Sequence, residues 1–252
     1  MRYLASLISA AAMVAVMLAG SVSAQAGELP DLPANWAKMG NVAHGRKIFT
    51  QGKGDAVPAC ASCHGADGTG SDDLGTPRLA DQVFTYEVKE LDDFASGKRT
   101  DLTLQAMNDI AKGLTPQDRR DVSAYVHTLK TKFVGSNLRA LAAAGTKIGN
   151  RSRGRMIVEF GLDGLPACKS CHGFHGRSAG RIFPMIGGQR FVYLTNQLHY
   201  WRAKTRHNDP MQMMEKVAAK MTDQDILDLA SYLTVSVPFT PGNPQQPPRD
   251  EW

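Results

Sequence analysis

Apolar residues recur at helical spacing in two separate stretches of the chain. In each stretch they are three to four residues apart, as on the buried face of an amphipathic helix. The first stretch contains Phe84, Val88, Leu91 and Phe94, and the second contains Phe191, Leu194, Leu198 and Trp201. No segment shows the clear alternation of apolar and polar residues that is typical of a half-buried strand. The pattern therefore predicts an all-α fold, built as small helical bundles.

Two further helices are predicted to begin at a threonine. Thr115 is followed three residues later by Asp118, and Thr222 is followed at the same spacing by Asp225. A threonine hydroxyl and an acidic group three residues on can satisfy backbone N–H groups that a helix start leaves unpaired. An apolar face follows each start. These faces consist of Val122, Tyr125, Val126 and Leu129 in one helix, and of Ile226, Leu229 and Leu233 in the other.

The chain repeats itself after a shift of about 108 residues, which is far longer than the period of a solenoid. The segment PACASCHG at residues 58–65 matches PACKSCHG at residues 166–173. Other pairs follow in the same order, among them Gly45 with Gly154 and Pro77 with Pro184. The repeat predicts two tandem domains, residues 41–133 and 154–237. A basic linker (residues 134–153) joins them, and a Pro-rich tail (residues 238–252) follows.

The N-terminus has the pattern of an export signal. Arg2 precedes an uncharged apolar run from Leu4 to Ala19, and small residues follow it. This order predicts a secretory signal peptide over residues 1–24, cleaved after Ala24 or Ala26. The alternative is an uncleaved membrane anchor, but the run is shorter than the ~20 residues of a spanning helix. We therefore expect a periplasmic protein with at most peripheral membrane association.

Composition narrows the class of protein further. The chain has 252 residues, a formal net charge of +5 and four cysteines. Four cysteines are too few for a disulfide-built scaffold of this length. The mild positive charge lacks the dense basic stripe of a nucleic-acid-binding domain, so no nucleic-acid partner is expected.

All four cysteines lie in two CxxCH motifs, one in each repeat. The first consists of Cys60, Cys63 and His64, and the second of Cys168, Cys171 and His172. This is the attachment signature of c-type haem, in which the two thiols bond to the porphyrin and the imidazole binds the iron. The alternatives are a zinc site, whose CxxC pairs are normally much closer together, and a redox dithiol. Two covalently attached haem c groups are the prediction.

The second iron ligand is predicted from the repeat. Met107 and Met214 lie the same distance before Thr115 and Thr222, and they are the only methionines that coincide under the shift. Met213 and Met211 are the fallbacks in the second domain, and core packing is the alternative role for any methionine. No other histidine has a histidine counterpart. The histidines without one are His44, His127, His175, His199 and His207.

These motifs together resemble class I cytochrome c. Each repeat has a CxxCH, a Pro-x-Leu or Pro-x-Ile 12 to 13 residues later, a methionine and a closing amphipathic helix. Two such domains behind a signal peptide are similar to the di-haem cytochrome c4 family, over roughly residues 41–133 and 154–237. The resemblance implies that the Pro77 and Pro184 carbonyls accept hydrogen bonds from the iron-binding histidines. The long basic linker and the Pro-rich tail depart from the family pattern.

Iron held by His and Met has no open coordination position, so it changes oxidation state without binding a substrate. We therefore expect a one-electron carrier with no catalytic residues. The expected donor is a quinol-oxidising complex or a dehydrogenase, and the acceptor a terminal oxidase or similar protein. One alternative is the cytochrome subunit of a specific dehydrogenase, such as one that oxidises a sulfur compound. A less favoured alternative is a di-haem peroxidase.

Overall fold

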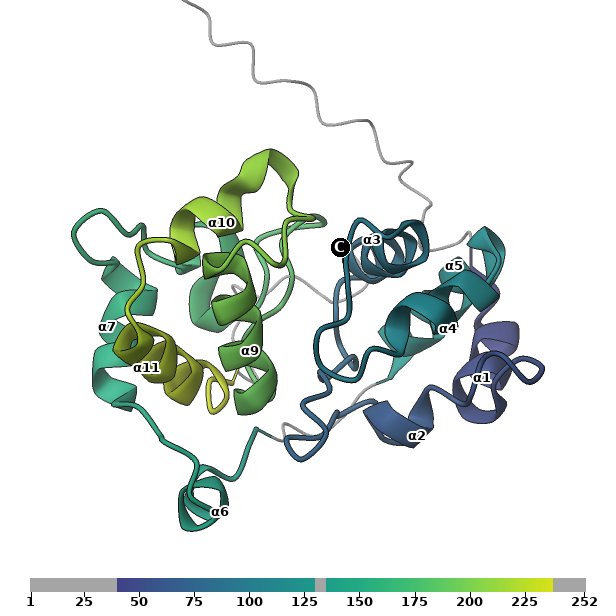
Figure 1. The fold of residues 1–252 in the computed structure, drawn as a ribbon, viewed down its shortest axis with the longest axis horizontal. Coiled ribbons are helices and arrows are strands. Elements are labelled where there is room, and N and C mark those ends of the chain that lie inside the picture. Colours follow the sequence, from purple (N-terminus) through teal and green to yellow (C-terminus); the bar gives the residue numbers. More distant parts are fainter. Residues whose placement is uncertain (1–39, 130–134, 238–252) are drawn as a thin grey trace, which may run out of the picture. The chain divides into compact units, whose positions relative to one another are not determined.

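The computed structural model describes residues 40–129 and 135–237 (Figure 1). The predicted signal peptide and the Pro-rich tail lie outside the described residues. Both repeats belong to the same compact unit of the chain. Regular structure in these ranges is helical, and the only extended pairings are isolated bridges such as Lys53 with Val57. No helix in the described ranges is long and apolar enough to cross a bilayer.

The two repeats use the same order of helices. The first repeat contains α1 (Val42–Gln51), α2 (Ala61–His64), α3 (Phe84–Ser96), α4 (Met107–Gly113) and α5 (Pro116–Thr128). The second contains α7 (Arg151–Phe160), α8 (Lys169–His172), η2 (Phe174–Gly176), α9 (Phe191–Arg202), η3 (Pro210–Gln212), α10 (Met213–Ala218) and α11 (Asp223–Leu233). The helices predicted from the two apolar stretches are α3 and α9. The all-α prediction is confirmed.

Both threonine caps form as predicted. The Thr115 hydroxyl accepts from the Asp118 N–H, and the Asp118 carboxylate accepts from the Thr115 N–H at 2.8 Å. Thr222 and Asp225 make the same reciprocal pair at the start of α11. Each pair satisfies two N–H groups that would otherwise lack a partner, which is worth about 1 kcal/mol per cap.

The first and last helices of each repeat cross at a glycine. A Cβ on Gly45 of α1 would lie 1.9 Å from the Asp121 carbonyl oxygen of α5. A Cβ on Gly154 of α7 would lie 2.0 Å from the Asp228 carbonyl oxygen of α11. No side chain fits at that separation, so only glycine allows each pair of helices to pack this closely.

Each crossing closes a hydrophobic core. The residues of the first core are Ile48, Phe49, Val57, Leu114, Val122 and Val126. The second core is larger and includes Ile157, Val158, Leu165, Phe191, Leu194, Trp201, Ile226, Leu229 and Leu233. The predicted apolar faces of α5, α9 and α11 supply these cores, whereas Phe84 and Val88 of α3 form a separate small cluster with Ala124.

The predicted linker contributes to the second repeat. It contains a short helix, α6 (Leu138–Ala143), whose Leu138 and Leu141 pack against the second core. Before it, the Ser136 hydroxyl accepts from the Phe191 N–H at 2.8 Å. Helix α7 also begins inside the predicted linker, at Arg151 with Asn150 as its cap. Much of this segment is thus part of the second bundle, a role that its basic composition did not indicate.

Two glutamines connect the repeats reciprocally. The side-chain amide of Gln82 donates to the Met185 carbonyl at 2.9 Å and accepts from the Met185 N–H at 2.8 Å. Gln189 makes the equivalent pair with the backbone of Arg78, at 2.9 and 2.6 Å. Each glutamine amide therefore bonds to both the N–H and the carbonyl of one residue in the other repeat. The two contacts are equivalent under the sequence repeat.

A buried polar cluster also joins the repeats. Arg99 and Arg206, from equivalent positions, both donate to the Glu90 carboxylate, at 2.5 and 3.1 Å. Both also donate to the side-chain oxygen of Gln197, which stands where Glu90 stands in the first repeat. Two arginines thus share one carboxylate, because the second repeat has glutamine where the first has glutamate.

Candidate haem sites

The first CxxCH motif forms one helical turn. Cys60 precedes α2 and His64 ends it, so both thiols and the imidazole come from the same turn. His64 is 7% exposed, and its Nδ1 lies 3.1 Å from the Pro77 carbonyl oxygen. That hydrogen bond orients the ring and leaves Nε2 as the nitrogen for a metal. Burial lowers the pKa of His64, against the opposing effects of the Pro77 carbonyl and the Asp101 charge, which favours the neutral imidazole that a metal needs.

The second motif repeats this geometry. His172 ends α8, is 7% exposed, and has its Nδ1 2.9 Å from the Pro184 carbonyl oxygen. The ring of Phe183 meets the His172 ring edge-on, with centroids 6.1 Å apart. Burial lowers the pKa of His172 as well. Both proline carbonyls therefore lie where the family resemblance implies.

The four cysteines are all described, and none is paired in a disulfide. Burial raises the pKa of Cys60 to about 11 and that of Cys168 to about 12. Cys171 is exposed, and the other three cysteines are half-buried. Each motif thus presents two thiols and one oriented imidazole on a single turn, which is the donor set that haem c requires. The residues fit the group.

The candidate methionines stand at the start of short helices. Met107 is the first residue of α4 and Met214 the second residue of α10. Both are half-buried, and Met214 packs against the second core. Of the fallbacks, Met213 is also half-buried, but Met211 is 74% exposed. No contact within the described residues joins either methionine to its histidine.

Two acidic residues hold these helix starts in place. The Asp101 carboxylate accepts from the N–H groups of Ala106 and Met107, at 3.1 and 3.2 Å. In the second repeat, Asp209 accepts from the Met214 N–H. The charge of Asp101 also favours a higher pKa of His64, although burial outweighs it. The sequence does not single out either acid, because Asp101 and Asp209 are one position out of register and the repeat does not align them.

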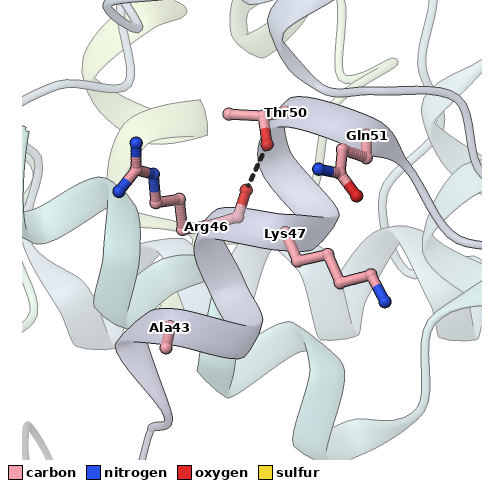
Figure 2. A pocket seen from close by; sticks show the side chains of 5 residues that line it. All are labelled: Ala43, Arg46, Lys47, Thr50 and Gln51. Carbon is pink, nitrogen blue, oxygen red and sulfur yellow. Dashed lines mark hydrogen bonds between the residues drawn. The ribbon is translucent and has the colours of Figure 1, made fainter.

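The described part of the chain also has a surface pocket on α1, whose lining contains no cysteine, histidine or methionine. Figure 2 shows its lining residues, which are Ala43, Arg46, Lys47, Thr50 and Gln51. The Thr50 hydroxyl donates to the Arg46 carbonyl at 2.8 Å. None of these residues can form a thioether or supply a soft ligand to iron, so the pocket lies outside the haem sites.

Comparison with known proteins identifies the group that these motifs hold. Residues 42–130 match the family model described as cytochrome c. The chain is 36% identical over 196 residues to cytochrome c4 of Pseudomonas aeruginosa, covering 76% of this chain and 90% of the relative.

The chain belongs to the cytochrome c4 family.

Other relatives of this cytochrome agree with that assignment. It is 38% identical to the thiosulfate dehydrogenase electron acceptor of Stutzerimonas stutzeri, covering 75% of this chain and 85% of that protein. The crystal structure of reduced cytochrome c4 from Pseudomonas stutzeri has 30% identity and a TM-score of 0.64, covering 79% of this chain and all of that one. Thiosulfate dehydrogenase from Marichromatium purpuratum has 32% identity and a TM-score of 0.69; the match covers 83% of this chain but 43% of that one.

Family membership decides between the alternatives left open by the motifs. This cytochrome c4 carries two covalently bound haem c groups, so zinc and redox-dithiol roles for the cysteines are set aside. It is an electron-transfer protein that exchanges electrons with redox partners, and the peroxidase alternative is not supported. Haem iron with its electron-donating ligands supplies the redox change, and the protein supplies its binding, orientation and surroundings.

Proposed function

We propose that this cytochrome c4 is a periplasmic one-electron carrier with His64–Met107 and His172–Met214 as its two axial ligand pairs. The observation that carries the proposal is the repeated hydrogen bond from a buried histidine to a proline carbonyl, at 3.1 and 2.9 Å. Each bond fixes one imidazole and would leave its other nitrogen available to bind the iron. A methionine on the opposite face would close the coordination shell and favour the ferrous state.

The cysteines would fix each haem to its own domain. Cys60 and Cys63 would form thioethers in the domain of residues 41–133, and Cys168 and Cys171 in the domain of residues 154–237. Covalent attachment keeps the cofactor on a protein that has been exported, and the N-terminal signal pattern supports export to the periplasm. The two hydrophobic cores share no residues, so each domain would hold its haem against a core of its own.

The first test is the haem content of the mature protein. Acid–acetone extraction should leave all haem on the protein, with two haems per chain. Replacing Cys168 and Cys171 by alanine should leave one. Replacing Cys60 and Cys63 in a matched variant should remove the other, and retention of two covalently bound haems in either variant would contradict the assignment.

The donor is proposed to be a dehydrogenase or a quinol-oxidising complex, and the acceptor a terminal oxidase or similar protein. The similarity to a thiosulfate dehydrogenase electron acceptor, and to a solved thiosulfate dehydrogenase, favours a dehydrogenase as donor. The second candidate function is therefore the electron-accepting partner of a thiosulfate dehydrogenase.

Stopped-flow absorption separates the two functions. The oxidised cytochrome is mixed with a thiosulfate dehydrogenase and thiosulfate, or with a quinol-oxidising complex and quinol. Fast reduction by the first mixture alone supports the acceptor role, and fast reduction by the second supports a general carrier. The variant lacking Cys168 and Cys171 serves as control, because it should accept half as many electrons from the same donor.

A further inference from the structure

Within the described residues, Glu87 has the one carboxyl group whose two oxygens are both shielded from solvent and without a hydrogen-bond partner. The Glu87 side chain lies in α3, and the residue is 8% exposed. Neither carboxyl oxygen has a hydrogen-bond partner, although protein atoms alone shield both from solvent. A carboxylate in such a place is strongly disfavoured, because burial costs the charged form its hydration. Burial accordingly raises the pKa of Glu87 well above its ordinary range.

Glu87 lies close to the first haem attachment site. Burial is the main cause of the raised pKa of Cys60, and the charges of Cys63 and Glu87 add to it. An interaction of this kind requires the carboxyl group and the sulfur to share one poorly solvated region. The Cys60 sulfur is the atom that would bond to the porphyrin, so a charge on Glu87 would act on a haem held at this site.

The second repeat has no equivalent group. Leu194 occupies the matching position in α9, where it is 6% exposed and belongs to the second core. The same helix position is therefore a packing position in one repeat and an ionisable one in the other. Packing alone explains Leu194 but does not explain a carboxyl group without a partner.

The charged and titratable groups around α3 are engaged elsewhere. On α3 itself, Lys89 pairs with Glu90 and Asp93, and Arg119 of α5 pairs with Asp92. Glu90 is bound by Arg99 and Arg206. The remaining groups on α4 and α5 also have other partners: Asp109 with Lys112, Asp118 with Lys53, Arg120 with Gln117, Asp121 with His44, and His127 with the Gln82 carbonyl. Burial is the one cause of the raised pKa of Glu87.

We propose that Glu87 is a redox-linked proton acceptor for the first haem. Transfer of one electron from the donor protein to a haem held at this site would remove one positive charge from its iron. The nearby Glu87 carboxylate is then less stabilised, and it takes up one proton from water to become the neutral acid. Oxidation releases the electron to the acceptor protein and the proton to water. No other bond forms or breaks.

The sign of the effect follows from linkage. Glu87 has a higher pKa beside ferrous than beside ferric haem, because the positive charge of the ferric form favours the carboxylate. Between these two pKa values the reduction equilibrium depends on pH, and at most each tenfold fall in proton concentration disfavours reduction tenfold. The second haem, with Leu194 in place of Glu87, lacks this source of pH dependence.

The test is a spectroscopic redox titration of the full protein from about pH 5 to about pH 10. Wild type, Glu87→Gln and Glu87→Leu are compared, the last copying the residue of the second repeat. We expect wild type to contain one centre whose reduction is pH-dependent by up to tenfold per pH unit, and both variants to lose that dependence. Asp92→Asn is the matched control, because it removes an exposed carboxylate from the same helix, and it should behave as wild type.

Infrared difference spectroscopy gives a second readout. Reduction of wild type should produce a carbonyl band of a protonated carboxylic acid, shifted in D₂O and absent in Glu87→Gln. The same pH dependence in wild type and both variants would overturn the proposal, as would the absence of that band. The inference rests on the proposed haem attachment at Cys60. Loss of that assignment would be seen separately, as a missing covalent haem before any titration.

Discussion

The backbone N–H of Met107 donates to the Asp101 carboxylate, 3.2 Å away. The same carboxylate accepts from the N–H groups of Thr103, Leu104 and Ala106, so it fixes the backbone of the loop that leads into α4. In the second repeat, Asp209 does this for Met214 from one position further along the chain. An acidic group at each site therefore fixes the backbone of the candidate methionine.

Replacing Asp101 by asparagine should loosen the first methionine. Hydrogen bonds to a charged group are worth about 1.5–3 kcal/mol, and asparagine retains a single neutral acceptor oxygen. We expect ferric Asp101→Asn to bind cyanide at one haem several-fold more tightly than wild type, with a weaker far-red sulfur-to-iron band. Asp109→Asn, which removes an exposed carboxylate from α4, should leave both properties unchanged. Equal cyanide affinity in both variants would contradict a positioning role.

Alanine substitution of the candidate methionines tests the ligand assignment directly. Met107→Ala should remove about half of the far-red band, lower one reduction potential and open one iron to carbon monoxide, because thioether ligation favours ferrous iron. Met214→Ala should do the same at the other haem. Met213→Ala should not, and if it alone alters the second haem, the ligand is the neighbouring residue.

The ion pairs of Glu90 with two buried arginines should make the free energy of unfolding depend on pH in the acid range. Burial opposes ionisation of Glu90, but Arg206, Arg99 and Lys89 overcome it and hold its pKa well below the ordinary range. A depressed pKa stabilises the fold above the ordinary carboxylate pKa of ~4.3, and this contribution is lost as pH falls through the folded value. Urea unfolding should show a steeper loss of stability below about pH 4.5 in wild type than in Glu90→Gln.

The same cluster offers a gain of stability. Arg99 and Arg206 both donate to Gln197, at 2.9 and 2.8 Å, so Gln197→Glu would place a second carboxylate between two cations. At neutral pH we expect Glu90→Gln to lose about 3 kcal/mol, because removal of one partner strands buried charge. Gln197→Glu should unfold at a higher urea concentration than wild type. A destabilised Gln197→Glu would show that the two arginines are already balanced.

One arginine of α7 links that helix to two acids of α11. Arg153 donates to Asp225 at 2.5 Å and to Asp228 at 2.7 Å, and both acids are buried. Arg153→Ala leaves these carboxylates short of a partner and should cost about 1–2 kcal/mol, since the arginine itself is partly exposed. Arg155→Ala, on an exposed position of the same helix, should cost far less. Urea unfolding at neutral pH measures both.

Much of each haem site could be predicted because its signals are local. The spacing of Cys60, Cys63 and His64 alone indicates haem attachment, because one helical turn carries all three groups. The Thr115 cap depends on Asp118, three residues away, and it formed as the sequence predicted. The apolar spacing of α3 and α9 also needed no tertiary information, because a helix face is set by its own periodicity.

Other features needed contacts between residues far apart in sequence. Gln82 reaches Met185, Arg99 and Arg206 meet at Glu90, and α6 packs on the second core; each contact exists only once the helices are placed. Gln82 and Gln189, and likewise Arg99 and Arg206, do match under the repeat, so the duplication marked these positions without revealing their partners. The burial of Glu87 is of the same kind. Sequence periodicity gives the face of a helix, but the solvation of a single carboxyl group depends on every element packed around it.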